Sequence, residues 1–124
     1  MAYTRVSTEY LETKLVKGLT RTSPATETKT LDAIMKALGA AKAPILVIDG
    51  GAASAHWRKL ADPLIEALKI PFLITTLGKG IANEESPYYR GPYVGEGSPP
   101  NTVKAVAQSD CILSIGNYPS DFNT

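Results

Sequence analysis

The spacing of apolar residues changes several times along this chain, and each change predicts a new element of secondary structure. The first pattern has the i, i+3, i+4, i+7 spacing of one buried helix face, at Leu31, Ile34, Met35 and Leu38. We expect this helix to have Thr30 as its N-cap and to end at Gly39.

Three short runs are mostly apolar and rich in β-branched residues, which is typical of strands covered on both faces of a sheet. They span residues 45–48, 72–75 and 111–115, and Pro44 and Pro71 precede the first two. Between the first two runs the helical spacing returns, at Trp57, Leu60, Ala61, Leu64, Ile65 and Leu68. Because Pro63 falls inside this stretch, the helix either kinks there or gives way to a second short helix capped by Asp62.

Residues 81–100 have the composition of a loop, and a short helix is expected over residues 101–108. The order strand, helix, strand, helix, strand predicts a parallel sheet with right-handed crossovers. We therefore expect an α/β fold, a Rossmann-like parallel sheet with flanking helices. Domains of this type usually continue with a further helix and strand, so we expect truncation at the C-terminus. Residues 1–28, rich in Thr, Ser, Lys and Glu, are predicted to be a linker, and residues 29–124 the incomplete domain.

Composition narrows the class of protein. The 124 residues suffice for one domain, and 44% hydrophobic with 20% charged residues is ordinary for a globular chain. The net charge is +1 and the basic residues are scattered, which excludes a typical nucleic-acid binder. The sequence has no apolar stretch long enough for a membrane helix and no Cys/His set with zinc spacing. We expect a cytoplasmic protein with no nucleic-acid or membrane partner.

Two glycine turns are weak candidates for a nucleotide site. Gly50 and Gly51, followed by Ser54, connect the first strand to a helix, where α/β folds often bind phosphate through helix N-terminal amides. Lys79 lies between two glycines after the second strand. Neither turn has the spacing of G-x-G-x-x-G or of a P-loop, so a tight structural turn is the simpler interpretation of both.

Other residues with reactive side chains have simpler interpretations. His56 is the single histidine, and Ser54 lies too close to it in sequence to make a persuasive catalytic pair. Cys111 lies in a predicted buried strand, so we interpret it as a small core residue. Glu84 and Glu85 precede a proline-tyrosine loop and are interpreted as solvated surface.

Several stretches together resemble, in order and spacing, the central domain of thiamine diphosphate-dependent pyruvate decarboxylases of the fungal type. They are PILVIDGG (44–51), TTLGKGIANE (75–84), YRGPYVGEGS (89–98), SDCILSIG (109–116) and SDFNT (120–124). The resemblance covers roughly residues 30–124. It implies a lyase that decarboxylates pyruvate or a related 2-oxo acid to an aldehyde, using thiamine diphosphate and Mg²⁺.

In that family the activating glutamate belongs to an N-terminal domain and the metal ligands to a C-terminal domain. The resemblance therefore implies no catalytic residue, no metal ligand and no bound cofactor in this segment. Its partners would be those two domains, in a homo-oligomer (a dimer or tetramer), and its role would be assembly or regulation. The GEGS stretch, residues 95–98, is similar to the GDGS opening of the thiamine diphosphate motif, but Asn117 and Asn123 do not supply the required Asn-rich partner.

One regulatory pattern of the family is altered here. Several members have a cysteine just before an Arg-His pair, whereas this chain has GAASA (51–55) ahead of His56, so His56 is the only regulatory candidate kept. Two other hypotheses remain open. One is a free-standing Rossmann-like module that binds an adenine nucleotide or FAD at Gly50 and Gly51. The other is a purely structural assembly domain.

Overall fold

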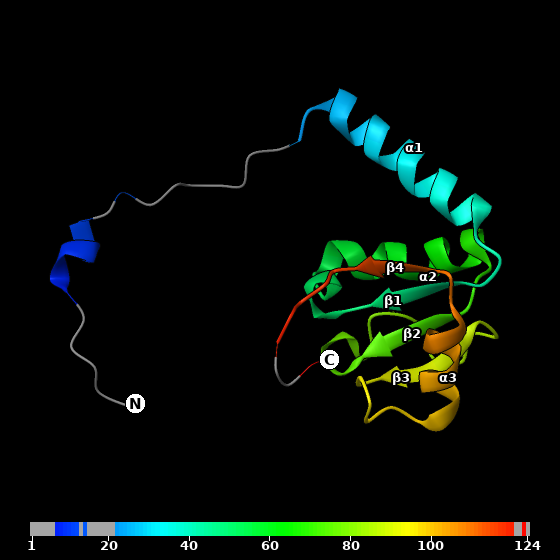
Figure 1. Ribbon diagram of the computed structural model, residues 1–124. Helices are drawn as coiled ribbons and strands as arrows, with labels where there is room; N and C mark the ends of the chain where they lie inside the picture. The colour runs from blue at the N-terminus through cyan, green and yellow to red at the C-terminus, as the bar shows by residue number, and fades with distance from the viewer. Residues whose placement is uncertain (1–6, 13, 15–21, 121–122, 124) are drawn as a thin grey trace.

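The computed structural model describes residues 7–12, 14, 22–120 and 123. At its centre is a parallel sheet with the strand order β3-β2-β1-β4 (Figure 1). The strands are β1 (Pro44–Ile48), β2 (Phe72–Thr75), β3 (Tyr89–Tyr93) and β4 (Cys111–Ile115). The helices are α1 (Pro24–Ala40), α2 (Ala55–Leu68) and α3 (Pro100–Gln108), with 3-10 turns η1 (Thr8–Glu12), η2 (Gly50–Ala52) and η3 (Thr76–Gly78). The predicted α/β, Rossmann-like class is confirmed.

Alternate side chains of β1 and β2 form two apolar clusters, one on each face of the sheet. The larger cluster includes two residues of α2, Ala61 and Ile65. Its other members are Leu46, Ile48, Ala52, Phe72, Ile74, Ile81 and Ala82. The smaller one consists of Ile45, Val47 and Leu73, with Ala105 and Val106 of α3 packed against it. The two inner strands are therefore covered on both faces, as their apolar sequence predicts.

The strand at residues 111–115 has the predicted bounds, but the prediction that it is buried is wrong. β4 pairs only with β1 among the described strands, and its residues are partly buried or exposed, with Ile112 51% exposed. Cys111 is only partly buried for the same reason. The apolar sequence of β4 resembles that of an inner strand. Its residues are less buried than those of an inner strand because an edge strand has a neighbour on one side only.

β3 was not predicted, because it lies in the segment interpreted as a loop. It forms the opposite edge of the sheet, beside β2, and its register shifts between Phe72 and Ile74. Gly91 has a φ of 111°, and Pro92 lacks an amide hydrogen. Both residues weaken the strand signal in the sequence and are tolerated at an edge.

α2 is one continuous helix that contains Pro63, so the alternative of two helices is wrong. Ser54 caps its N-terminus by accepting a hydrogen bond from the Trp57 amide. Asp62 does not cap a second helix, because its carboxylate accepts a hydrogen bond from the Asn83 amide at 2.8 Å.

α1 begins earlier than predicted, at Pro24, and runs through Gly39 to Ala40. Ser23 is its N-cap and Pro24 occupies the first helical position, where the missing amide hydrogen has no cost. The expectation that its apolar face is buried is also wrong. None of its residues is buried, and the helix stands clear of the sheet beyond β4 (Figure 1).

Candidate functional site

The carboxyl ends of β1, β2 and β4 meet at one edge of the sheet, where open α/β proteins usually bind ligands. Asp49 directly follows β1 and is only 2% exposed. Its Oδ1 accepts hydrogen bonds from the Gly50 amide at 2.5 Å and from the hydroxyl of Thr75, at the end of β2, at 2.6 Å. Its Oδ2 accepts one from the Tyr118 amide, beyond β4, at 2.7 Å. One carboxylate thus joins the ends of three strands.

Asn123 completes this network and is 1% exposed. Its Nδ2 donates to Oδ1 of Asp49 at 2.7 Å and to the Tyr118 carbonyl at 3.0 Å. Its Oδ1 accepts a hydrogen bond from the Leu77 amide at 3.3 Å. The Asn123 side chain therefore holds the chain that follows β4 against the turn that follows β2.

The environment of Asp49 favours the charged form of its carboxylate. Burial by itself would raise its pKa, but the hydrogen bonds from Thr75, the Tyr118 amide, Asn123 and the Gly50 amide outweigh that effect. The net result is a pKa below the ordinary value. An acid with a lowered pKa and with donors on both oxygens is suited to holding structure together and unsuited to general acid-base work at neutral pH.

This network was not predicted from the sequence. Asp49 and Thr75 each stand at the end of a buried strand, and parallel strands bring such ends together. That placement was the available signal. Asn123 gave no signal of its own, because it lies 74 residues from Asp49 in an irregular segment.

The glycine pair of the candidate nucleotide turn has a packing role. The Gly51 amide donates to the Gly116 carbonyl at 2.8 Å, and the Gly50 amide donates to Asp49. A Cβ on Gly51 would lie 2.6 Å from the Gly116 oxygen, and one on Gly50 would lie 2.7 Å from Cβ of Leu77. Both amides that would bind a phosphate are therefore used inside the protein, and the glycines permit close approach of neighbouring turns.

The other two nucleotide candidates are also engaged elsewhere. Ser54 is the N-cap of α2. Lys79 forms an ion pair with Glu84, with 2.5 Å between Nζ and Oε2. The hydrogen bond from Lys79 is the largest cause of the lowered pKa of Glu84. Glu84 also accepts a hydrogen bond from Tyr89. Glu84 is thus more than solvated surface, and the structure does not gather the candidates around one ligand.

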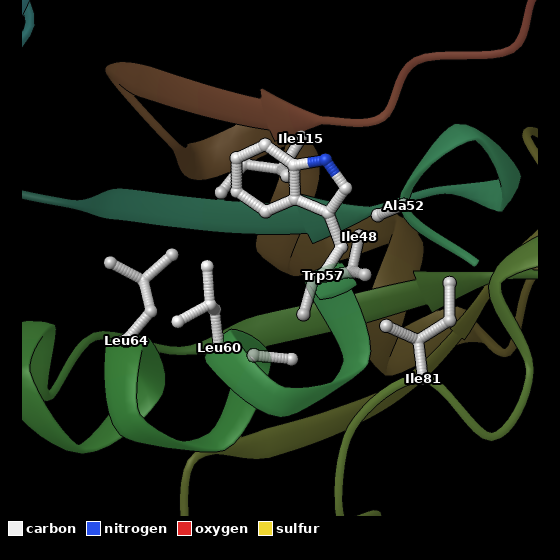
Figure 2. Close-up of a pocket in the computed structure, with 8 residues that line it drawn as sticks. Ile48, Ala52, Trp57, Leu60, Leu64, Ile81 and Ile115 are labelled. Carbon is white, nitrogen blue, oxygen red and sulfur yellow. The ribbon is translucent and has the colours of Figure 1, made fainter. Parts of the chain in front are cut away.

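His56 lies in the first turn of α2 and is exposed, with its ring edge-on to Trp57 at a centroid distance of 6.0 Å. Beside it, Figure 2 shows the Trp57 indole reaching from the start of α2 across a small, open apolar pocket. The pocket is lined by Ile48, Ala52, Trp57, Leu60, Ala61, Leu64, Ile81 and Ile115. The lining residues carry no carboxylate, hydroxyl, thiol or basic group that could act together with His56.

The GEGS stretch is built as a tight turn. Ser98 is buried, its hydroxyl donates to the Gly95 carbonyl at 2.6 Å, and it accepts from the Val94 amide at 2.7 Å. Glu96 is exposed. Among the residues that the structure describes, no three His, Cys, Asp or Glu side chains are grouped to hold a metal ion. The GEGS turn thus offers one carboxylate, that of the exposed Glu96, and its serine hydroxyl is used inside the turn. In the part of the chain that the structure describes, every helix is too short or too polar to span a membrane.

Comparison with known proteins gives one consistent result. Residues 31–124 match the family described as "Thiamine pyrophosphate enzyme, central domain". The chain is 36% identical over 120 residues to a pyruvate decarboxylase of Candida glabrata, which covers 97% of this chain and 21% of that protein. It is 34% identical over 124 residues to a pyruvate decarboxylase of Aspergillus fumigatus, covering 100% of this chain and 22% of that protein.

A third relative, pyruvate decarboxylase isozyme 3 of Saccharomyces cerevisiae, is 33% identical over 120 residues, again 97% of this chain and 21% of that protein. The chain therefore spans about a fifth of the length of the relatives it matches. The matched segment contains the whole sheet and both helices that cover it. The free-standing nucleotide module is not favoured, and the chain belongs to the central-domain family of the thiamine pyrophosphate enzymes.

Proposed function

We propose that this domain is the central, non-catalytic assembly domain of a thiamine diphosphate-dependent 2-oxo acid decarboxylase that converts pyruvate to acetaldehyde and CO₂. The parent enzyme uses Mg²⁺ to hold the cofactor, works in the cytoplasm and forms a homo-oligomer. The cofactor and metal are held by its N- and C-terminal domains, and this segment supplies no catalytic residue. The observation that carries the proposal is the match of residues 31–124 to the central-domain family, together with the similarity of 97–100% of the chain to enzymes named pyruvate decarboxylase.

Two features of the structure support a role in assembly. The carboxyl edge of the sheet, the usual ligand site, is occupied by the protein's own Asp49 and Asn123 side chains. The edge of β4 has no strand beside it among the described residues, and exposed apolar side chains lie nearby, including Trp57 and Ile112. Such surfaces in a folded domain usually contact another part of the protein.

Domain replacement tests the proposal. The matched segment of the Candida glabrata pyruvate decarboxylase is replaced by residues 31–124, and acetaldehyde formation is followed by its reduction with alcohol dehydrogenase. We expect the chimera to assemble and to decarboxylate pyruvate. A chimera that folds and assembles but has no activity would contradict the proposal, and the chain alone should release no CO₂ from pyruvate.

Titration of the chain alone tests the competing hypothesis. We expect no heat of binding with ADP or FAD at micromolar concentrations. Saturable binding that is lost in Gly51→Ala, and kept in Gly39→Ala, would favour the nucleotide-binding module.

A further inference from the structure

Three serines of this chain directly precede a proline, and the structure gives them different surroundings. They are Ser23, Ser86 and Ser98. A Ser-Pro pair is the minimal sequence that proline-directed protein kinases phosphorylate. Proline has a fixed φ and no amide hydrogen, and it holds the residue before it in extended backbone. The sequence therefore supplies three equal candidates for modification, and the environment of each hydroxyl distinguishes them.

Two of the three hydroxyls are held within turns. Ser98 is 7% exposed, and its Oγ donates to the Gly95 carbonyl at 2.6 Å and accepts from the Val94 amide at 2.7 Å. Ser86 is partly buried, and its Oγ accepts from the Tyr88 amide at 3.3 Å. Either turn would have to open before its serine could lie in the active site of a kinase.

Ser23 has a different environment from the other two serines. It is exposed, and its backbone is extended, with φ −66° and ψ 147°. Its Oγ pairs with the Thr26 hydroxyl at 2.8 Å and accepts from the Thr26 amide at 3.3 Å. Both bonds lie at the surface, where water or a binding partner replaces them easily. The hydroxyl of Ser23 is therefore accessible in the folded chain.

The residues around Ser23 can also follow it into an extended segment. All residues from 22 to 33 are exposed, so the first half of α1 buries no side chain. The amino end of α1 is also the end that lies away from the sheet (Figure 1). The first turn of a helix without buried contacts opens readily, because helix ends fray. A kinase can thus bind this segment while the sheet stays folded.

We propose that Ser23 is the phosphorylation site of a proline-directed protein kinase. Oγ of Ser23 attacks the γ-phosphorus of Mg²⁺-bound ATP, and the bond between that phosphorus and the bridging oxygen of ADP breaks. The hydroxyl proton passes to the catalytic aspartate of the kinase, and ADP leaves. The product is a phosphate monoester on Ser23. The inference concerns this chain alone and does not depend on the proposed enzyme.

The phosphate would alter the start of α1, because Ser23 is its N-cap residue. The amides of a first helical turn have no acceptor within the helix, and a phosphate adds acceptor oxygens and a charge of about −1.5 to −2 at pH 7. Negative charge at this end of a helix is stabilising. Glu27 adds an opposing like charge in the same turn, but it is exposed and screened by solvent. Phosphorylation should therefore reduce fraying of α1.

A comparison of the folded chain with short peptides tests the site. The chain is incubated with Mg²⁺, ATP and a mitogen-activated protein kinase, which is proline-directed, and peptide mass spectrometry locates the phosphate. Synthetic peptides centred on Ser23, Ser86 and Ser98 are treated in the same way. We expect all three peptides to be phosphorylated, and the folded chain to be phosphorylated at Ser23 alone. A folded chain that stays unmodified at Ser23, or is modified as fast at Ser86 or Ser98, overturns the proposal.

Two variants show whether the proline directs the reaction. Pro24→Ala keeps the Ser23 hydroxyl and places a good helix former at the first helical position, and it should abolish phosphorylation. Thr22→Ala removes the neighbouring exposed hydroxyl and should be phosphorylated like the native chain. Far-UV circular dichroism shows that each variant is folded. Equal phosphorylation of Pro24→Ala and the native chain contradicts a proline-directed site.

Hydrogen exchange measures the effect of the phosphate on α1. In the phosphorylated chain the amides of residues 25–27 should exchange about two- to fivefold more slowly than in the unmodified chain. Treatment with a phosphatase should restore the original rate, and α3 should exchange equally in both forms. Exchange of residues 25–27 that is unchanged or faster after phosphorylation overturns the stabilising position of the phosphate at the N-cap.

Discussion

The amide nitrogen of Asn123 donates a hydrogen bond to the carboxylate of Asp49 at 2.7 Å, across 74 residues of sequence. Both side chains are buried, and the bond joins the end of the first strand to the segment after the last one. A hydrogen bond between distant segments constrains the chain more than a local one, because it closes a long loop. This pair therefore helps to fix the carboxyl edge of the sheet.

The first prediction concerns this pair. Asp49→Ala leaves the buried donors of Thr75 and Asn123 without an acceptor, and we expect a loss of about 3 kcal/mol in the free energy of unfolding. Asn123→Ala should cost about 1.5 kcal/mol. Urea denaturation measures both, and the double variant should show a coupling of about 1 kcal/mol. Asn117→Ala, at an exposed position of the same edge, is the control and should change stability by less than about 0.5 kcal/mol.

The second prediction concerns pH. Folding lowers the pKa of Asp49, so its negative charge stabilises the folded state. This contribution is fully present at pH values above the pKa that Asp49 has in the unfolded chain, near 3.8. That contribution is lost as the pH falls through 3.8 toward the lower folded value. The difference in unfolding free energy between the native chain and Asp49→Asn should therefore be largest near neutral pH and should shrink in acid. Glu84 and Asp110 also have lowered pKa values. Both residues are present in the native chain and in Asp49→Asn, so their contributions cancel in the difference between the two unfolding free energies. A difference that grows on acidification would contradict the assigned direction.

The third prediction concerns close approach between turns. Gly51→Ala would bring a Cβ to 2.6 Å from the Gly116 oxygen, and we expect destabilisation of about 2 kcal/mol as the two turns separate. Gly39→Ala is the matched control, because nothing lies within 4 Å of its added Cβ and the site is helical. It should be neutral or stabilise by up to about 1 kcal/mol. Thermal unfolding followed by circular dichroism measures both, and equal effects would contradict the packing role of Gly51.

The fourth prediction concerns Tyr89. Burial raises its pKa most, and the charge of Glu84 raises it further. Glu84→Gln should lower the Tyr89 pKa toward 10.0 without reaching it, because the effect of burial remains. Alkaline absorbance titration measures the shift, with Tyr89→Phe identifying its share among the six tyrosines. Glu85→Gln, at the adjacent exposed residue, should leave the titration unchanged.

Much of the fold could be predicted from local sequence. The bounds of β2 and β4 were predicted correctly and those of β1 within one residue, because continuous apolar runs are a strong strand signal. β3 escaped prediction because Gly91 and Pro92 depress strand propensity and the partner strand supplies the pairing. The early start of α1 was missed although Ser23 and Pro24 form a good cap, since the Thr-rich residues after them suggested a linker.

The candidate site was harder to predict than the fold. The glycine turns were visible in the sequence, but their neighbours were not, because Gly116 and Leu77 approach them only in three dimensions. The exposed state of the apolar face of α1 was equally hidden. Periodicity predicts which residues share a helix face, and it does not predict whether a second surface lies against that face.

The two edges of the sheet differ in their capacity to bind another strand. At β3, Pro92 and the shifted register interrupt the row of hydrogen-bonding groups, which discourages pairing with a foreign strand. β4 has no proline between Cys111 and Ile115, and its outer side is free of strands in the described part of the chain. Association of isolated chains through their sheets would therefore join β4 to β4 about a two-fold axis. In such a pair the β4 edges of both chains are used, so only the β3 edges remain unpaired. Growth into a fibre would need pairing at β3, which Pro92 discourages.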